Sequence, residues 1–171
     1  MIIRPATESD IPQITTIYAR SVREEIVSFE LEPPDETEML HRMQGLLAND
    51  YPYLVAEKDG EIAGYVYASV HRPRPAYAKT VESTVYVDPS FWRQGIARAL
   101  LVALIEKCQQ QQFRQMIAIA ACDPDADLSE IPSVQLHLAL GFVESGRLKA
   151  VGYKHDKWLD IVLMQRAVQI S

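Results

Sequence analysis

The stretch VYVDPSFWRQGIARALLVA, residues 85–103, predicts a strand that passes through a short turn into a helix. Asp88-Pro89 ends the strand, and Arg93–Arg98 opens the helix, so unpaired backbone N–H groups and the positive helix end converge on one point. Gly95 lets an anion approach the backbone closely, and Ala97 keeps the next turn small. The turn therefore suits a pyrophosphate, although its spacing alone fits an ordinary strand-to-helix turn equally well.

The residues just upstream alternate as those of a half-buried strand do. In the run Thr80–Val87, Glu82 shares one face with Tyr86, and the valines lie on the other face. Further upstream, strand-like runs at 54–57 and 61–68 flank Asp59-Gly60, a pair that suits the positive φ angles of a tight hairpin. These patterns predict neighbouring antiparallel strands.

Helical spacing of apolar residues marks three more elements. It runs from Ile11 to Val22, from about Asp35 to Leu47, and from Gly95 to about Gln111. Ser133 is expected to cap a short helix that ends at Leu140, with Gly141 in the left-handed position after it. The remaining strands are expected at residues 2–6, 116–120, 142–149 and 159–166. The order of elements predicts a mixed sheet with helices on its faces.

Length and composition limit the possible partners. The chain has 171 residues and is 48% apolar, which predicts one domain spanning residues 1–171.

The net charge of −6 disfavours broad affinity for nucleic acid or anionic membranes, so neither is an expected partner. Cys108 and Cys122 have no second pair for a disulfide framework or zinc site, and no metal is expected. No secretory signal or membrane-spanning run is visible, which favours a cytoplasmic protein.

Several short motifs together resemble the GNAT superfamily of N-acetyltransferases. They are residues 85–89, residues 93–97, Leu136-His137 and Leu140–Phe142. Further stretches resemble the phosphinothricin and methionine sulfoximine acetyltransferases of that superfamily; they are residues 29–33, 51–57, 72–77, 80–83, 151–155 and 158–160. The resemblance implies a GNAT fold of the α/β (α+β) class, with a single mixed, mostly antiparallel central sheet and helices on both faces.

The resemblance also implies acetyl-CoA as cosubstrate. The residues that match its binding positions are Val85, Tyr86, Val87, Arg93, Gln94, Gly95, Ile96, Ala97, Arg98, Ala99 and Ser133. Two positions depart from the family. Trp92 stands where glutamine or arginine is usual and cannot donate to a phosphate as they would, which leaves Arg93 to compensate. Glu130 stands where the family tends to have asparagine.

Acetyl transfer from a thioester to an amine needs a base, a polarised carbonyl and an acid for the departing thiolate. Glu82 is a carboxylate within an otherwise apolar and hydroxyl-bearing strand, and the resemblance assigns it the role of base. A solvent-facing strand residue is the alternative. His137 is a second acid/base candidate, and a histidine that merely packs its helix is nearly as good an interpretation. Tyr86 is a reserve acid.

Two arginines precede the strand that carries Glu82. Arg72 and Arg74 flank prolines in an acidic chain and could hold a carboxylate or phosphinate, although charged loop residues are usually only solvated. The resemblance places both, with Tyr77, in a substrate loop, and it makes Phe29 a candidate wall for the substrate side chain. Lys154, His155 and Trp158 match a late loop of the family and could complete the pocket or a subunit contact.

The implied reaction is acetylation of the α-amino group of a small amino-acid-like amine, such as phosphinothricin, methionine sulfoximine or methionine sulfone. The family also implies a homodimer. One alternative is a GNAT enzyme for a polyamine or a protein N-terminus, favoured by Glu30 and Glu32 and disfavoured by the arginine-bearing loop. Another is a non-catalytic acyl-CoA sensor, favoured by Trp92 and Glu130.

Overall fold

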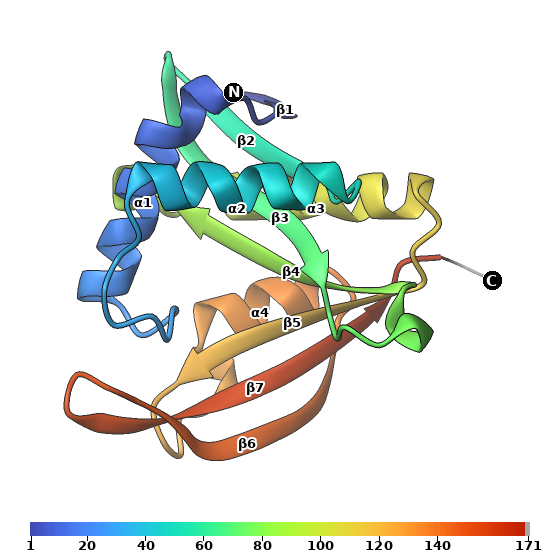
Figure 1. Ribbon diagram of the computed structural model, residues 1–171. Coiled ribbons are helices and arrows are strands. Elements are labelled where there is room, and N and C mark those ends of the chain that lie inside the picture. Colours follow the sequence, from blue (N-terminus) through green and yellow to red (C-terminus); the bar gives the residue numbers. More distant parts are fainter. Residues whose placement is uncertain (170–171) are drawn as a thin grey trace.

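A computed structural model describes residues 1–169, in which seven strands form one sheet with the order β1-β2-β3-β4-β5-β7-β6 (Figure 1). The strands are β1 Ile2–Pro5, β2 Tyr53–Lys58, β3 Glu61–Val70, β4 Thr80–Val87, β5 Gln115–Cys122, β6 Val143–Lys154 and β7 Lys157–Ala167. The α-helices are α1 Ile11–Glu24, α2 Glu36–Ala48, α3 Ile96–Gln110 and α4 Pro132–Ala139. Among these strands the β4–β5 pair is parallel and the other pairs are antiparallel. The predicted mixed, mostly antiparallel sheet is confirmed.

The alternation in β4 divides the apolar residues into two cores, one on each face of the sheet. Val81 is fully buried, and Val85 and Val87 pack on the same side, which α3 covers. Tyr86 packs on the opposite side, with residues of α1 and α2. Helices therefore cover both faces, and Glu82 belongs to the face of α1.

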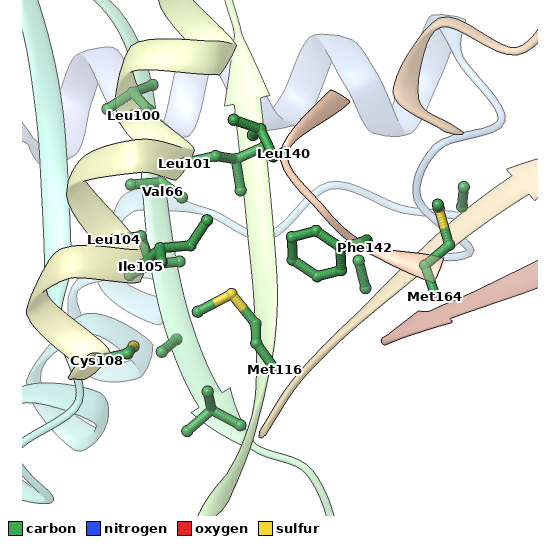
Figure 2. Close-up of a cluster of buried hydrophobic side chains, with 14 of the residues drawn as sticks. Val66, Leu100, Leu101, Leu104, Ile105, Cys108, Met116, Leu140, Phe142 and Met164 are labelled. Carbon is green, nitrogen blue, oxygen red and sulfur yellow. The ribbon is translucent and has the colours of Figure 1, made fainter. Parts of the chain in front are cut away.

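The larger core lies between α3 and the sheet. Figure 2 shows Leu101 and Leu104 of α3 directed towards Met116 of β5 and Phe142, which follows α4. Leu100, Leu101, Leu104 and Met116 are each 0% exposed. Burying side chains of this size contributes roughly 1.5–3 kcal/mol apiece, so this core fixes α3 against the sheet.

Local signals explain several element ends. Asp59 and Gly60 have φ angles of 54° and 84°, as the predicted tight hairpin between β2 and β3 requires. The Asp35 side chain accepts a hydrogen bond from the Glu38 N–H at 2.8 Å and so caps α2. Gly141 follows α4 with a φ of 81°.

Two local predictions were wrong. The cap of α4 is Ile131 rather than Ser133, because Pro132 occupies the first helical position, where its missing N–H is not needed. The last two strands are longer than predicted, since β6 and β7 meet in a hairpin at His155-Asp156. Both turn residues have positive φ without a glycine to mark the turn, which is why the sequence pattern ended the strands early.

Strands β4 and β5 pair over only part of their length. The pairing joins Thr80–Ser83 to Gln115–Ala118 and then stops, while β4 continues along β3 and β5 continues along β7. In Figure 1 the two strands run together at one end and separate towards the other.

Beyond the separation, the backbone of β4 has a free edge. The Asp88 N–H bonds to the Ala63 carbonyl of the β3 side at 2.9 Å. Because backbone groups alternate in direction along an antiparallel pair, the N–H and C=O groups of Tyr86 also point to β3, and those of Val85 and Val87 point into the gap. The sheet thus offers hydrogen-bonding groups where a strand would otherwise lie.

Gly64 sets how closely β3 and β4 approach at this end. A Cβ added there would lie 2.6 Å from the Tyr86 carbonyl oxygen and 3.1 Å from the Val87 Cα. These are backbone atoms, so relief requires the two strands to shift.

We expect Gly64→Ala to lower the free energy of unfolding by about 2 kcal/mol, as overpacking does, measured by urea denaturation. Gly45→Ala in α2 is the matched control, because an added Cβ there meets no atom within 4 Å. That change should raise stability by about 1 kcal/mol through helix propensity. A Gly64→Ala variant as stable as the unchanged protein would contradict the close approach of the strands.

Candidate active site

A cavity of about 390 Å³ lies where β4 and β5 separate, a size typical of small-molecule sites. Its walls are residues 82–87 of β4, residues 118–121 of β5, Ser21, Glu25, residues 27–29, Trp92, Ser133, His137 and Ile161. The fold therefore brings the two acid/base candidates, Glu82 and His137, to one cavity together with Phe29. A groove of about 550 Å³ beside α1 and residues 33–36 contains none of the predicted site residues.

The predicted phosphate-binding turn has the backbone conformation that the sequence requires. Arg93 and Gly95 have φ angles of 60° and 78°, and Gly95 is the N-cap of α3. The first helical bond runs from the Ala99 N–H to the Gly95 carbonyl at 3.0 Å. The preceding N–H groups of the first turn therefore have no acceptor within the helix and face outward, where an anion can bind them.

Side chains around this turn divide into exposed and internally bonded groups. Arg93 and Arg98 are exposed and can reach a bound anion. The Gln94 side chain instead donates to the Ser90 carbonyl at 3.3 Å and accepts from the Lys58 amine. The Gln94 side chain thus stabilises the turn, and only the backbone N–H of Gln94 is left to bind a ligand.

Trp92 has a structural contact at the position where the family usually has glutamine or arginine. Its indole Nε1 donates to the Val87 carbonyl at 3.0 Å, although the residue is 53% exposed. The bond ties the turn to the end of β4. It also occupies the Val87 carbonyl, so the Val87 N–H and both backbone groups of Val85 remain directed into the gap.

Glu82 lies at the last paired part of β4, opposite Ser69 of β3 and Ile117 of β5. Its side chain is 28% exposed and contacts His71, with 2.8 Å between Glu82 Oε1 and His71 Nδ1. We did not predict His71 from the sequence. The signal was in the strand register, because Ser69 pairs with Glu82 and His71 follows two residues later.

His137 both packs its helix and lines the cavity, so its two interpretations are compatible. It is 6% exposed, and its ring meets Phe142 edge-on with 4.9 Å between ring centroids. Nδ1 lies 2.6 Å from the Ser133 carbonyl oxygen. Because a carbonyl only accepts, Nδ1 carries the proton and Nε2 is the basic nitrogen. Burial lowers the pKa of His137.

Tyr86 lines the cavity from within a cluster of tyrosines. Its ring lies 5.0 Å from that of Tyr18 and 5.5 Å from that of Tyr65, measured between centroids. Burial raises the pKa of Tyr86 far above its usual value. The phenol therefore keeps its proton and is a poor acid for a departing thiolate.

The predicted substrate loop lies beside the cavity rather than in its wall. Arg72, Arg74 and Tyr77 are exposed and are absent from the lining residues. The Arg72 guanidinium lies 5.8 Å from the centroid of the Tyr77 ring, and that ring lies 5.6 Å from the His71 ring. The loop thus reaches Glu82 only through His71.

The segment that carries Phe29 is held against the far edge of the sheet. Lys154 of β6, which is 4% exposed, donates to the Ser28 carbonyl at 2.5 Å. The Phe29 ring lies over Gly152, where an added Cβ would approach it to 2.2 Å. Lys154 thus holds Ser28, which lines the cavity, without lining the cavity itself. Trp158, by contrast, is 57% exposed.

We expect the free energy of unfolding to fall as pH drops below about 6.5, because the unfolded His137 then takes up a proton that the folded one, with its lowered pKa, resists. His137→Asn keeps a donor for the Ser133 carbonyl but does not titrate, so it should lose this part of the pH dependence. Urea denaturation at pH 7.5 and 5.5 measures it. Equal losses in both proteins would contradict the assignment.

Comparisons with known proteins agree with this geometry. The model of the acetyltransferase (GNAT) family matches residues 14–142. The phosphinothricin N-acetyltransferase of Alcaligenes faecalis is 46% identical over 164 residues, which are 96% of this chain and 81% of the relative. The L-methionine sulfoximine/L-methionine sulfone acetyltransferase of Salmonella typhimurium is 30% identical over 96% of this chain and 93% of its own.

A solved structure gives the same result. It is a GNAT superfamily phosphinothricin acetyltransferase from Sinorhizobium meliloti in complex with AcCoA, with a TM-score of 0.90 and 41% identity over 97% of this chain and 87% of that one. The family match spans most of the chain, and the mixed, mostly antiparallel sheet is as the resemblance implied. This chain therefore belongs to the GNAT family of acetyltransferases.

Proposed function

We propose that this acetyltransferase uses acetyl-CoA to acetylate the α-amino group of phosphinothricin, methionine sulfoximine or methionine sulfone. The observation that carries the proposal is the position of Glu82, a carboxylate that lines the cavity beside the free edge of β4. The names and the end-to-end similarity of the relatives support this substrate class.

The residues present fit acetyl-CoA. Its pantetheine arm contains amide groups, which can pair with both backbone groups of Val85 in the gap as a strand would, and this leaves the Val87 N–H for the thioester carbonyl. Its pyrophosphate suits the outward N–H groups at the start of α3, with Arg93 and Arg98 as exposed cations nearby. Ser133 lines the cavity and can contact the arm from α4.

In the proposed reaction, Glu82 accepts the proton from the substrate amine, directly or through a water. The neutral nitrogen then attacks the thioester carbonyl, a bond to the acyl carbon forms, and the thiolate leaves and takes up a proton. The Val87 N–H is the best-placed backbone donor for the carbonyl oxygen, because the Tyr86 N–H points to β3. His137 offers Nε2 as a second site for a proton.

Two features support an amino-acid-like substrate. Phe29 lines the cavity and offers an apolar wall to its side chain. Arg72 and Arg74 are exposed cations of the loop that follows His71, outside the lining residues, and would have to move towards the cavity to bind a carboxylate or phosphinate. Acetylation removes the positive charge of the amine, so an enzyme of this kind would confer resistance to such an amino-acid analogue.

We also propose a cytoplasmic homodimer. Cys108 and Cys122 are both buried free thiols, as suits a reducing compartment. Apolar side chains are exposed along β6 and β7, namely those of Val143, Leu148, Val151, Tyr153 and Trp158, and they could form a subunit contact. In the described part of the chain, no helix combines the length and apolarity needed to cross a membrane.

We expect steady-state acetylation of at least one of the three compounds, and a fall in kcat of about 10²- to 10⁴-fold for Glu82→Gln, as for loss of a general base. Glu61→Gln is the control, because Glu61 is an exposed glutamate at the start of β3 and should leave kcat unchanged. Acetyl-CoA binding, measured by calorimetry, should be similar in all three proteins.

Other outcomes would support the alternatives. Acetyl-CoA binding without transfer to any amine would favour a non-catalytic sensor. Transfer to polyamines or a peptide N-terminus, with none to the three amino acids, would reject the proposed substrate class.

A further inference from the structure

We propose that His71 is a positioning residue for Glu82, which binds one carboxylate oxygen and directs the other into the cavity. The inference rests on the proposed role of Glu82 as the base and adds a residue to it.

The contact separates the two oxygens of the carboxylate. His71 Nδ1 lies 2.8 Å from Glu82 Oε1, and the two side chains are 20% and 28% exposed. Because the ionised carboxylate of Glu82 can only accept a hydrogen bond, His71 Nδ1 must carry the proton. Glu82 lines the cavity and His71 does not, so the imidazole lies behind the carboxylate rather than beside the substrate.

The imidazole is itself held in place. His71 directly follows Val70, whose pairing with Val81 fixes the backbone at the end of β3. Its ring meets the Tyr77 ring nearly edge-on, with 5.6 Å between centroids and an angle of 75°. The Arg72 guanidinium lies 5.8 Å from the same tyrosine ring. A donor held by its strand-end backbone and by the Tyr77 ring can restrict the rotation of the glutamate side chain.

Without this bond the carboxylate would have more orientations available. Glu82 lines an opening of about 390 Å³, in which an unbonded glutamate side chain has room for several rotamers. A base that is held in the productive geometry raises the reaction rate, because a catalytic group displaced by only about 1 Å loses much of its contribution to that rate. The bond should therefore act on kcat more than on binding.

The test compares two replacements of similar size. His71→Asn keeps an N–H at the position of Nδ1, whereas His71→Gln moves its amide to the position of Nε2, away from Glu82. Loss of a hydrogen bond to a charged group is expected to lower a rate by roughly 10- to 100-fold when that bond acts in the transition state. We expect His71→Gln and His71→Leu to lose that factor in kcat with KM values for both substrates within about 2-fold, and His71→Asn to keep most of the activity.

A control and a double variant complete the experiment. His41→Leu changes an exposed histidine of α2, whose side chain is 83% exposed, and should leave kcat unchanged. His71→Gln in a Glu82→Gln background should cause no further loss, because the two residues act as one unit. Circular dichroism and acetyl-CoA calorimetry check the fold of each variant.

The outcomes separate the two proposals. If Glu82→Gln is slow but His71→Gln is as fast as the unchanged enzyme, the positioning role is wrong and the base assignment survives. If His71→Asn is as slow as His71→Gln, the donated bond is not what matters and the inference is also wrong. If Glu82→Gln itself is fully active, both proposals fail. Should His71→Leu not fold, the comparison of the asparagine and glutamine variants still decides.

Discussion

The separation of β4 from β5 is the constraint on which the rest of the structure depends. Each strand keeps a complete ladder on one side, β4 with β3 and β5 with β7, and gives up the ladder on the other beyond Ser83 and Ala118. Backbone N–H and C=O groups left without partners are costly unless water or a ligand satisfies them. The opening in the middle of the sheet therefore presents backbone groups that a ligand can satisfy.

The groups of β4 that line the cavity differ in whether they lie before or after Ser83, where the pairing with β5 ends. Glu82 lies where β4 is still paired on both edges, so its backbone is held on two sides. Val85 and Val87 lie beyond it, where one edge is open. A proton acceptor on the rigid part and hydrogen-bonding groups on the open part meet at one cavity, and His137 closes it from a helix anchored in the larger core.

Sequence patterns predicted those features that depend on neighbouring residues. The alternation of β4 placed Glu82 and Tyr86 on the face opposite the valines, and Asp59-Gly60 marked the hairpin between β2 and β3. His71 was missed because its contact with Glu82 spans a loop and depends on strand register. The β6–β7 turn was missed because His155-Asp156 adopts positive φ without glycine. Family motifs supplied the candidate site residues, but could not show that Arg72 lies outside the cavity wall.

The contact between Phe29 and Gly152 has a consequence for how such an enzyme can diversify. The aromatic wall rests on a position of the edge strand that has no side chain, and even one methyl group there would push the ring aside. If Phe29 borders the bound substrate as proposed, the room for the substrate's side chain is set from outside β4. Selection for a different amino acid could then act on this distant pair while Glu82 and the backbone of β4 stay unchanged.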